Sequence, residues 1–277
     1  MTFALGLVPV VDDAATRGAL TRVAAHLTAA LDRPCSVQVA RSPAALVEAF
    51  AAGAVDLSWT SPTLALRERA LRRAIPVATC VRQGVAHYHG VVFVKRHSPI
   101  RSALQLRGRR MGWVAETSAA GYIFPRLALA GLGLDPTVLF RAEQFFATHG
   151  ALVLSVLDGV VDAGATFAVF ESGDPMRPMV RAGFVDLGFE DDVRVLLATP
   201  AIPSDLFLAT PPLHEAHGEA LLDALSGAAE RHPDAFHRVF GAEGVVPPSA
   251  RALADLRRQL DDARALGVLD GPLADAI

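Results

Sequence analysis

Residues 88–95 read YHGVVFVK, a long extended stretch that separates two similar halves of the pattern. Before it, short apolar runs alternate with helical patterns, and after it the same alternation restarts near residue 102. Strands separated by helices in this way predict parallel βαβ units. We therefore expect an α/β fold with two lobes, joined by two crossings of extended chain. Such a pair of lobes can close around a ligand by a hinge motion.

The expected elements follow from the period of the apolar residues. In the first lobe, strands are expected over residues 5–10, 36–40, 54–59 and 75–80, with helices over 12–31, over 43–52 and from 62. In the second, strands are expected over 110–114, 138–142, 161–165 and 193–198, with helices over 119–130 and 150–157. A strand over 206–209 and a purely helical tail over 213–266 follow. We place residues 1–86 plus 199–277 in lobe 1 and residues 87–198 in lobe 2.

The composition excludes several classes of protein. Hydrophobic residues make up 52% and charged residues 20% of the 277 residues, which predicts a packed globular protein rather than a disordered one. The net charge of -3 and the lack of a long basic run argue against a nucleic-acid partner. No apolar run is long enough to span a bilayer. Cys35 and Cys80 form no metal-binding pattern, and we expect two buried thiols.

The N-terminal residues bear on localisation. A secretory signal needs a basic start, an apolar stretch and a small-residue cleavage site. Residues 3–10 instead resemble a first core strand. We therefore expect a periplasmic protein if a signal peptide has been removed, and a cytoplasmic protein otherwise.

Three expected helix starts follow strands and carry polar residues: Trp59-Thr60-Ser61-Pro62, Glu116-Thr117-Ser118-Ala119-Ala120 and Thr148-His149-Gly150. Ligands of open α/β sheets bind beyond the carboxyl ends of the strands. The free N–H groups and the dipole of a helix start also favour anions. A single Ser or Thr at such a place is ordinarily only a helix cap. Three such helix starts, in an order that fits two lobes, together predict a binding site for an anion.

Several short motifs recur in a fixed order along the chain. They read YHGVVFV at 88–94, SPI at 98–100, LQLRGRR at 104–110, SAAGYIFP at 118–125, HGAL at 149–152 and VDAGA at 161–165. In this order the chain resembles the phosphate, phosphite and phosphonate (PhnD-type) periplasmic substrate-binding family of ABC importers. The resemblance extends from GLVP at 6–9 to IPSD at 202–205 and fades in the tail.

This resemblance implies a type II periplasmic-binding fold that captures a small ligand and has an ABC permease as partner. It also implies an oxyanion bound by Tyr88, Ser118 and His149, together with the N–H groups of Ala119 and Ala120. Asp205 matches an acidic position that can face the amino end of a ligand. The residues of the first helix start, Thr60 and Ser61, are further candidates, and Trp59 is a candidate for stacking on the ligand.

The chain departs from the family pattern at three places. The family's Ser-Thr-Ser is Ser118-Ala119-Ala120 here, its early Tyr falls near Pro43, and an acidic residue falls near Val169, with Glu171 close by. A buried polar group without a partner costs about 1–3 kcal/mol. We therefore expect a small anionic or zwitterionic ligand that is either phosphonate- or phosphate-like or a diverged substitute.

Two other functions compete with transport. A cytosolic enzyme on the same fold would use His149, Glu116 or Asp205 as its general acid or base, although no nucleophile–base–orienter set is visible. A ligand sensor would pass lobe closure to a partner. His87 and His89, which point to one face of a strand, could join His149 in binding a transition metal. We weigh hydrogen bonding and solvation above this, and expect no metal, no cofactor and no catalytic residue.

Overall fold

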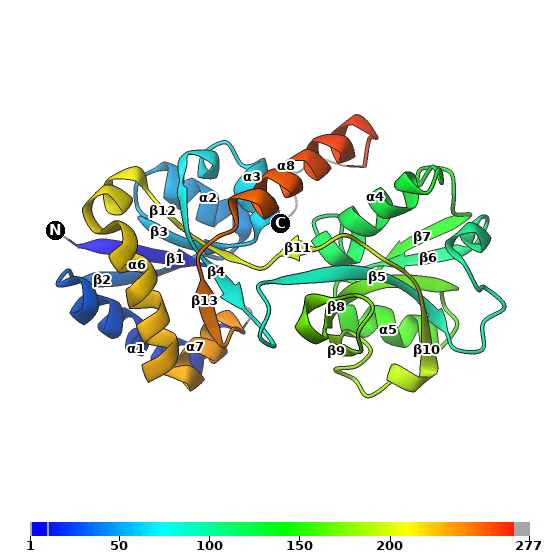
Figure 1. Ribbon diagram of the computed structural model, residues 1–277, viewed down its shortest axis with the longest axis horizontal. Coiled ribbons are helices and arrows are strands. Elements are labelled where there is room, and N and C mark those ends of the chain that lie inside the picture. Colours follow the sequence, from blue (N-terminus) through cyan, green and yellow to red (C-terminus); the bar gives the residue numbers. More distant parts are fainter. Residues whose placement is uncertain (1, 10, 269–277) are drawn as a thin grey trace. The chain divides into compact units, whose positions relative to one another are not determined.

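The computed structural model describes residues 2–9 and 11–268, which form two compact α/β units (Figure 1). Unit 1 contains the described residues up to Ala86 and Pro203–Ala254, and unit 2 contains His87–Ile202 and the described residues from Asp255 onward. The domain division expected from sequence assigned 199–202 and everything after 254 to the first lobe. It stays a prediction, and its residues 269–277 lie outside the described residues.

The described part of unit 1 contains a six-stranded sheet. Its order is β13 (Gly244–Val246), β4 (Ile75–Val81), β12 (Leu206–Ala209), β3 (Leu57–Thr60), β1 (Phe3–Leu7) and β2 (Cys35–Val39). Strand β1 is parallel to β2 and β3, and β12 is antiparallel to both β3 and β4. The carboxyl ends of β1 to β4 and the beginning of β12 therefore lie at one edge of the sheet.

Helices cover both faces of this sheet. They are α1 (Ala14–Leu31), α2 (Pro43–Ala51), α3 (Pro62–Arg67), α6 (Pro211–Arg231) and α7 (Pro233–Phe240). Helices α1, α6 and α7 pack on one face, where Leu27 and Phe236 join Phe207 in the core (Figure 1). On the other face, Leu46 of α2 packs with Leu208. Because Phe207 and Leu208 are neighbours in β12, the alternation of a strand serves both cores.

Unit 2 is built on a second sheet. Its main order is β10 (Val193–Ala198), β5 (His87–Lys95), β8 (Ala163–Phe170), β6 (Arg110–Trp113) and β7 (Ala142–Phe145), with β9 (Met179–Ala182) paired to β8. Strands β6, β7 and β8 are parallel, whereas β5 runs antiparallel to β8. The carboxyl ends of β6, β7 and β8 therefore share an edge with the beginning of β5.

Two helices cover the faces of this sheet. Helix α5 (His149–Leu157) packs on the face that carries Val91 and Phe93. Helix α4 (Phe124–Gly131) packs on the opposite face, near Val92. The remaining elements are the short turns η1 (Leu71–Arg73), η2 (Ala103–Leu106), η3 (Ala119–Ile123), η4 (Glu171–Gly173) and η5 (Glu190–Asp192), together with β11 (Ile202–Pro203) and α8 (Ala250–Ala265).

Two expected elements are wrong. Of the strand expected over 138–142, residues 138–141 form a turn, in which Leu139 is buried while Val138 is 68% exposed, and only Ala142 is in a strand. The observed strand β7 begins at Ala142, and its four residues are all exposed, with apolar side chains only at its two ends. The tail is not purely helical, because β13 lies between α7 and α8 and pairs with β4. The strand expected to reach residue 10 ends at Leu7, and residue 10 itself lies outside the described residues.

The cysteines are free in the described structure, with Cys80 buried and Cys35 half-buried. None of the helices in the described ranges is long and apolar enough to cross a membrane.

Candidate functional site

Polar groups collect at the edge of the unit 2 sheet where β6, β7 and β8 end and β5 begins. Ser118 follows β6, His149 follows β7, and Tyr88 lies at the start of β5. Both β5 and β8 contact η3, the helical turn that Ser118 opens. We call Tyr88, Ser118, Ala119, Ala120 and His149 the unit 2 rim. It brings the second and third polar helix starts expected from sequence to one edge of one sheet.

Ser118 begins a helical segment in an unusual way. Its backbone is extended, and its Oγ accepts a hydrogen bond from the N–H of Gly121 at 3.1 Å. The next five residues form a π-helical turn that continues into α4, with the N–H of Ile123 donating to the carbonyl of Ser118 at 3.0 Å. The first N–H groups of a helix have no intrahelical acceptor. Those of Ala119 and Ala120 are therefore the groups that an anion at this start would use.

Two glycines allow this helix start to approach the sheet. A Cβ at Gly90 of β5 would lie 2.9 Å from the carbonyl oxygen of Ala120 and 3.1 Å from Cγ of Pro125. A Cβ at Gly121 would lie 2.5 Å from Cγ2 of Val114. Contacts this short require the surroundings to shift. The close packing of backbone on backbone thus fixes the position of the N–H groups at the rim.

His149 is the first residue of α5, after Thr148, whose side chain accepts a hydrogen bond from the N–H of Ala151 at 3.1 Å. Nδ1 of His149 is hydrogen-bonded to Oγ1 of Thr166 at 2.8 Å, and the imidazole ring packs edge-on against the ring of Phe167, with 5.0 Å between their centres. Burial lowers the pKa of His149 to about 4. The imidazole is consequently neutral at neutral pH, and its Nε2 makes no hydrogen bond with the described residues.

Each of the two histidines of β5 forms a hydrogen bond with a backbone carbonyl. His87 donates from Nε2 to the carbonyl of Gly173 at 3.1 Å, and His89 donates from Nδ1 to the carbonyl of Thr199 at 2.8 Å. His89 is buried, and burial lowers its pKa. Over residues 2–9 and 11–268, no group of three or more His, Cys, Asp or Glu side chains is placed to hold a metal ion. Tyr88 lies half-buried between these two histidines in the strand.

In unit 1, the candidate residues are engaged with their own neighbours. Trp59 is buried, donates from Nε1 to Sγ of Cys80 at 3.4 Å and packs against Phe240 at 5.5 Å. Thr60 is buried at the end of β3, and Ser61 caps α3 by accepting from the N–H of Leu64 at 3.3 Å. These contacts are those of core packing and helix capping, and a ligand role for the three residues stays a prediction.

Asp205 lies just before β12 and forms an ion pair with Arg82, with 2.6 Å between the carboxylate Oδ2 and the guanidinium nitrogen. The same guanidinium donates to the carbonyls of Phe240 and Gly241, each at 2.8 Å. The pair is about three-quarters buried on both sides. These contacts fix where the Asp205 carboxylate lies, and a ligand role for Asp205 stays a prediction.

Sequence reasoning missed the partners that hold these residues. Arg82, Thr166 and Thr199 were not singled out, since each follows or belongs to a strand without any local motif. The side chain of Thr199 accepts from the N–H of Gly90 at 2.9 Å and so ties β5 to the end of β10. Asp162, which matched the resemblance, forms an ion pair with Arg110 at 2.7 Å and orients the start of β6.

A family model described as the periplasmic substrate-binding protein of phosphonate ABC transporters matches residues 5–253. Among solved structures, XAC2383 from Xanthomonas citri bound to chloride ion is 21% identical, with a TM-score of 0.76, over 95% of this chain and 99% of that one. PhnD1 from Prochlorococcus marinus in complex with methylphosphonate is 16% identical, with a TM-score of 0.65, over 96% and 98%.

The periplasmic aliphatic sulphonate binding protein SsuA from Escherichia coli is 17% identical, with a TM-score of 0.64, over 98% of this chain and 89% of that one. These similarities confirm the type II periplasmic-binding fold expected from the sequence. The matched family consists of solute-binding proteins rather than enzymes, so the expectation of a binding protein is confirmed over the enzyme alternative. The chain belongs to the phosphonate ABC transporter periplasmic substrate-binding protein family.

Proposed function

We propose that the protein binds a small organic oxyanion of the phosphonate or sulfonate type at the unit 2 rim and delivers it to the permease of an ABC importer. The observation that carries the proposal is the helix start at Ser118–Ala120, which shares one sheet edge with the neutral imidazole of His149. The known ligands of relatives support the same class, because PhnD1 was solved with methylphosphonate and SsuA is named for sulphonates.

The rim offers neutral donors to an anion. Free N–H groups at a helix start and the helix dipole together favour negative charge. The neutral His149 can donate a hydrogen bond from Nε2 while Nδ1 accepts from the hydroxyl of Thr166. A site built from these neutral donors needs no Lys or Arg side chain to bind an anion. Tyr88 is the remaining candidate donor, from β5.

The family pattern has hydroxyl residues where this chain has Ala119 and Ala120, and this difference affects which anion the rim prefers. Ala119 and Ala120 supply backbone N–H groups but no side-chain donors, and both are buried. A dianion loses more hydration free energy on burial than a monoanion of the same shape, and therefore needs more donors to compensate. We therefore propose that the rim prefers a sulfonate or a singly charged phosphonate over a doubly charged phosphate.

Further elements of the proposal rest on the family. Asp205 would face the amino end of a zwitterionic ligand, and Trp59, Thr60 and Ser61 would supply further contacts from unit 1. The periplasm is the proposed location and an ABC permease the proposed partner, as for the family. Capture by closure of two lobes is the proposed mechanism.

A thermal-shift screen tests the proposal. The purified chain is heated with methylphosphonate, methanesulfonate, phosphite or phosphate over a concentration series, since a ligand of the folded state raises Tm once its concentration exceeds Kd. We expect the largest shifts with methanesulfonate and methylphosphonate, both reduced in Ser118→Ala and Tyr88→Phe. The control is Ser42→Ala, because Ser42 also caps a helix, accepting from the N–H of Ala45 at 3.2 Å, but lies outside the rim. Equal shifts in Ser118→Ala and Ser42→Ala would contradict the proposal.

A further inference from the structure

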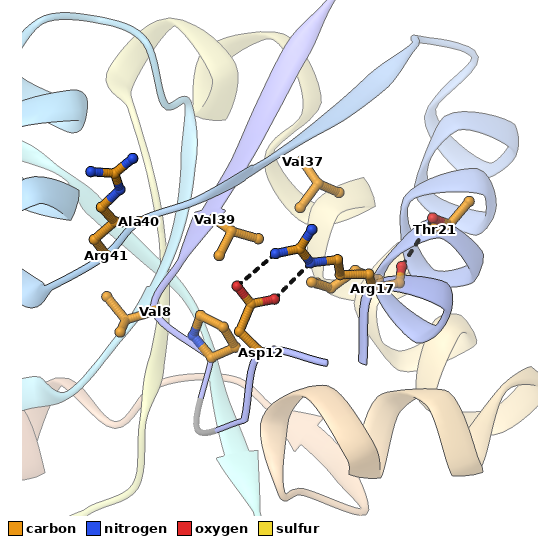
Figure 2. A pocket seen from close by; sticks show the side chains of 10 residues that line it. Val8, Asp12, Arg17, Thr21, Val37, Val39, Ala40 and Arg41 are labelled. Atoms are coloured by element: carbon orange, nitrogen blue, oxygen red, sulfur yellow. Dashed lines mark hydrogen bonds and ion pairs between the residues drawn. The ribbon is translucent and has the colours of Figure 1, made fainter. Parts of the chain in front are cut away.

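The described residues form a pocket in each unit. The one in unit 1 lies beyond the carboxyl ends of β1 and β2 (Figure 2). This is the sheet edge of Thr60 and Ser61, which the proposed function already uses. The pocket in unit 2, of about 660 Å³, is lined by α4, the end of β10 and the second half of α8, and contains no residue of the unit 2 rim. We call it the α4–α8 pocket, and its volume is within the range of small-molecule sites.

One side of α4 forms the first wall of this pocket. Four of the lining residues follow one another with the spacing of successive helical turns and so share one side of the helix: Phe124, Leu127, Ala128 and Gly131. A Cβ added at Gly131 would meet no atom within 4 Å. Leu132, which follows the helix, is 53% exposed. The small residues of α4 therefore leave the space open, and leucines border it.

The second wall comes from α8. Gln259 and Asp262 of this helix line the pocket together with Leu266, which follows its last residue but one place on, at intervals of three and four residues. A neighbouring stripe of the helix is buried, as Leu256 shows. Leu266 itself is 49% exposed. Both walls thus contain leucine surface that remains in contact with water, and a ligand that covers this surface gains free energy in proportion to the apolar area.

Asp262 is the single charged residue among those that line the pocket. Its side chain is exposed and forms no hydrogen bond or ion pair with the residues that the structure describes. The other two acidic residues of α8 are engaged, since Asp255 pairs with Arg258 and Asp261 pairs with Arg264. The lining therefore combines one negative charge, whose lone pairs are available, with leucine surface. A cation with an aliphatic body complements both.

We propose that the α4–α8 pocket binds an organic ammonium ion, with its ammonium group on Asp262 and its aliphatic part on Leu132 and Leu266. The aliphatic part supplies most of the affinity, because several buried methylenes together contribute more than one exposed ion pair. The charge of Asp262 selects a cation over an anion. The proposal does not rest on the function proposed for the unit 2 rim.

Amide NMR of the isotope-labelled protein, titrated with hexylammonium, butylammonium and hexanoate, tests it. We expect hexylammonium to shift the amide signals of Gly131, Leu132, Asp262 and Leu266 until they saturate. Binding should strengthen by about two- to fourfold per methylene from the butyl to the hexyl compound. An exposed charge pair changes affinity by about two- to fivefold, so hexanoate, which Asp262 repels, should bind correspondingly more weakly than hexylammonium.

Substitutions at Gly131 test the pocket itself. Gly131→Leu should fill the space and abolish the shift at Asp262, whereas Gly131→Ala, which adds one methyl group, should keep it. Both changes favour the helical state of α4, since glycine is a poor helix former, so a loss of binding would not reflect unfolding. Methylphosphonate binding at the unit 2 rim should be unchanged in Gly131→Leu, which separates failure of this proposal from failure of the proposed function.

Substitutions on α8 test the charge. Asp262→Asn should weaken hexylammonium binding by about two- to fivefold. The matched control is Asp261→Asn, which removes the same charge from the neighbouring residue outside the pocket. The proposal is overturned if hexylammonium shifts none of these amides, if Gly131→Leu binds it like the wild type, or if Asp262→Asn and Asp261→Asn bind it equally.

Discussion

In unit 1, Asp205 and Ser61 at the carboxyl edge of the sheet are bound to neighbours within the unit, whereas in unit 2 the helix start at the corresponding edge has backbone donors without acceptors among the described residues. Asp205 is paired with Arg82, and Ser61 caps its own helix. In unit 2, the helix start at Ser118 presents backbone N–H groups, and His149 uses only Nδ1. The same location in two α/β sheets therefore differs in what it can offer a ligand.

This difference indicates where an oxyanion finds its donors. A polar group that already has a hydrogen-bond partner within the protein must lose that partner before it can bind a ligand in its place. An N–H group without a partner instead gains one when the ligand binds. We therefore propose that the oxyanion binds in unit 2, and that Asp205 recognises an amino group through its remaining lone pairs while it stays paired with Arg82. The following predictions test this contrast, from the largest expected effect to the smallest.

Gly90→Ala should have the largest effect, because the new Cβ would lie 2.9 Å from the carbonyl oxygen of Ala120. We expect the free energy of unfolding to fall by about 2–3 kcal/mol, as for overpacked sites, and ligand affinity to fall as the helix start is displaced. Denaturant unfolding and calorimetric titration measure the two effects. Gly131→Ala is the control, since nothing lies within 4 Å of a Cβ there. Equal stability of the two variants would show that the close approach is unimportant.

His149 should make stability depend on pH. Its pKa is lowered from 6.5 to about 4 by burial. Between pH 4 and pH 6.5 the unfolded chain binds more protons at this residue than the folded chain does. The contribution of the neutral His149 to the free energy of unfolding is therefore intact above pH 6.5 and is lost as the pH falls to 4. The loss is at most about 3 kcal/mol. Urea unfolding between pH 4 and pH 7.5 should show this slope in the wild type and a shallower one in His149→Gln. Identical slopes would mean that the imidazole is not buried as described.

Asp205 and Arg82 should be energetically coupled. A double-mutant cycle with Asp205→Asn and Arg82→Gln should give a coupling energy of about 1 kcal/mol, since the pair is largely but not fully buried. In the same variants, Asp205→Asn should leave methylphosphonate affinity nearly unchanged and weaken 2-aminoethylphosphonate. If methylphosphonate binding is lost instead, Asp205 does not recognise an amino group and the contrast between the two units fails.

Ser118→Ala should cost about 1 kcal/mol of stability, the usual cost of a lost helix cap. Ser42→Ala should cost the same, because both hydroxyls accept from an N–H three residues later. Only the change at Ser118 should also weaken oxyanion binding, by about three- to tenfold. Calorimetric titration of both variants with methanesulfonate measures this difference. If Ser118→Ala and Ser42→Ala bind methanesulfonate with similar affinity, Ser118 acts only as a helix cap and does not bind the ligand.

The sequence predicted those features that depend on local chemistry. Pro62 begins α3 as expected, and α1, which Asp13 caps, begins within two residues of its expected start, because caps and first-turn prolines act within a few residues. Strand β5 was expected over nearly its full length from its apolar run. Strand β7 was missed because its residues are exposed and show no alternation, while the apolar Leu139 serves the core from a turn.

From the residues alone, the candidate site was predicted only as a set of separate helix starts, and their joint binding of one oxyanion was implied by the family resemblance. That Ser118 and His149 share an edge follows from the strand order, which the sequence does not state. Their partners were harder still, since Arg82 and Asp205 are 123 positions apart and His149 and Thr166 are 17 apart. Such pairs depend on the tertiary fold and leave no local pattern.

The central claim is that the unit 2 rim binds the oxyanion, and a crystal structure with methylphosphonate bound tests it most directly. The account predicts phosphonate oxygens within hydrogen-bonding distance of the N–H groups of Ala119 and Ala120 and of Nε2 of His149. A well-ordered methylphosphonate that contacts none of these groups would contradict it.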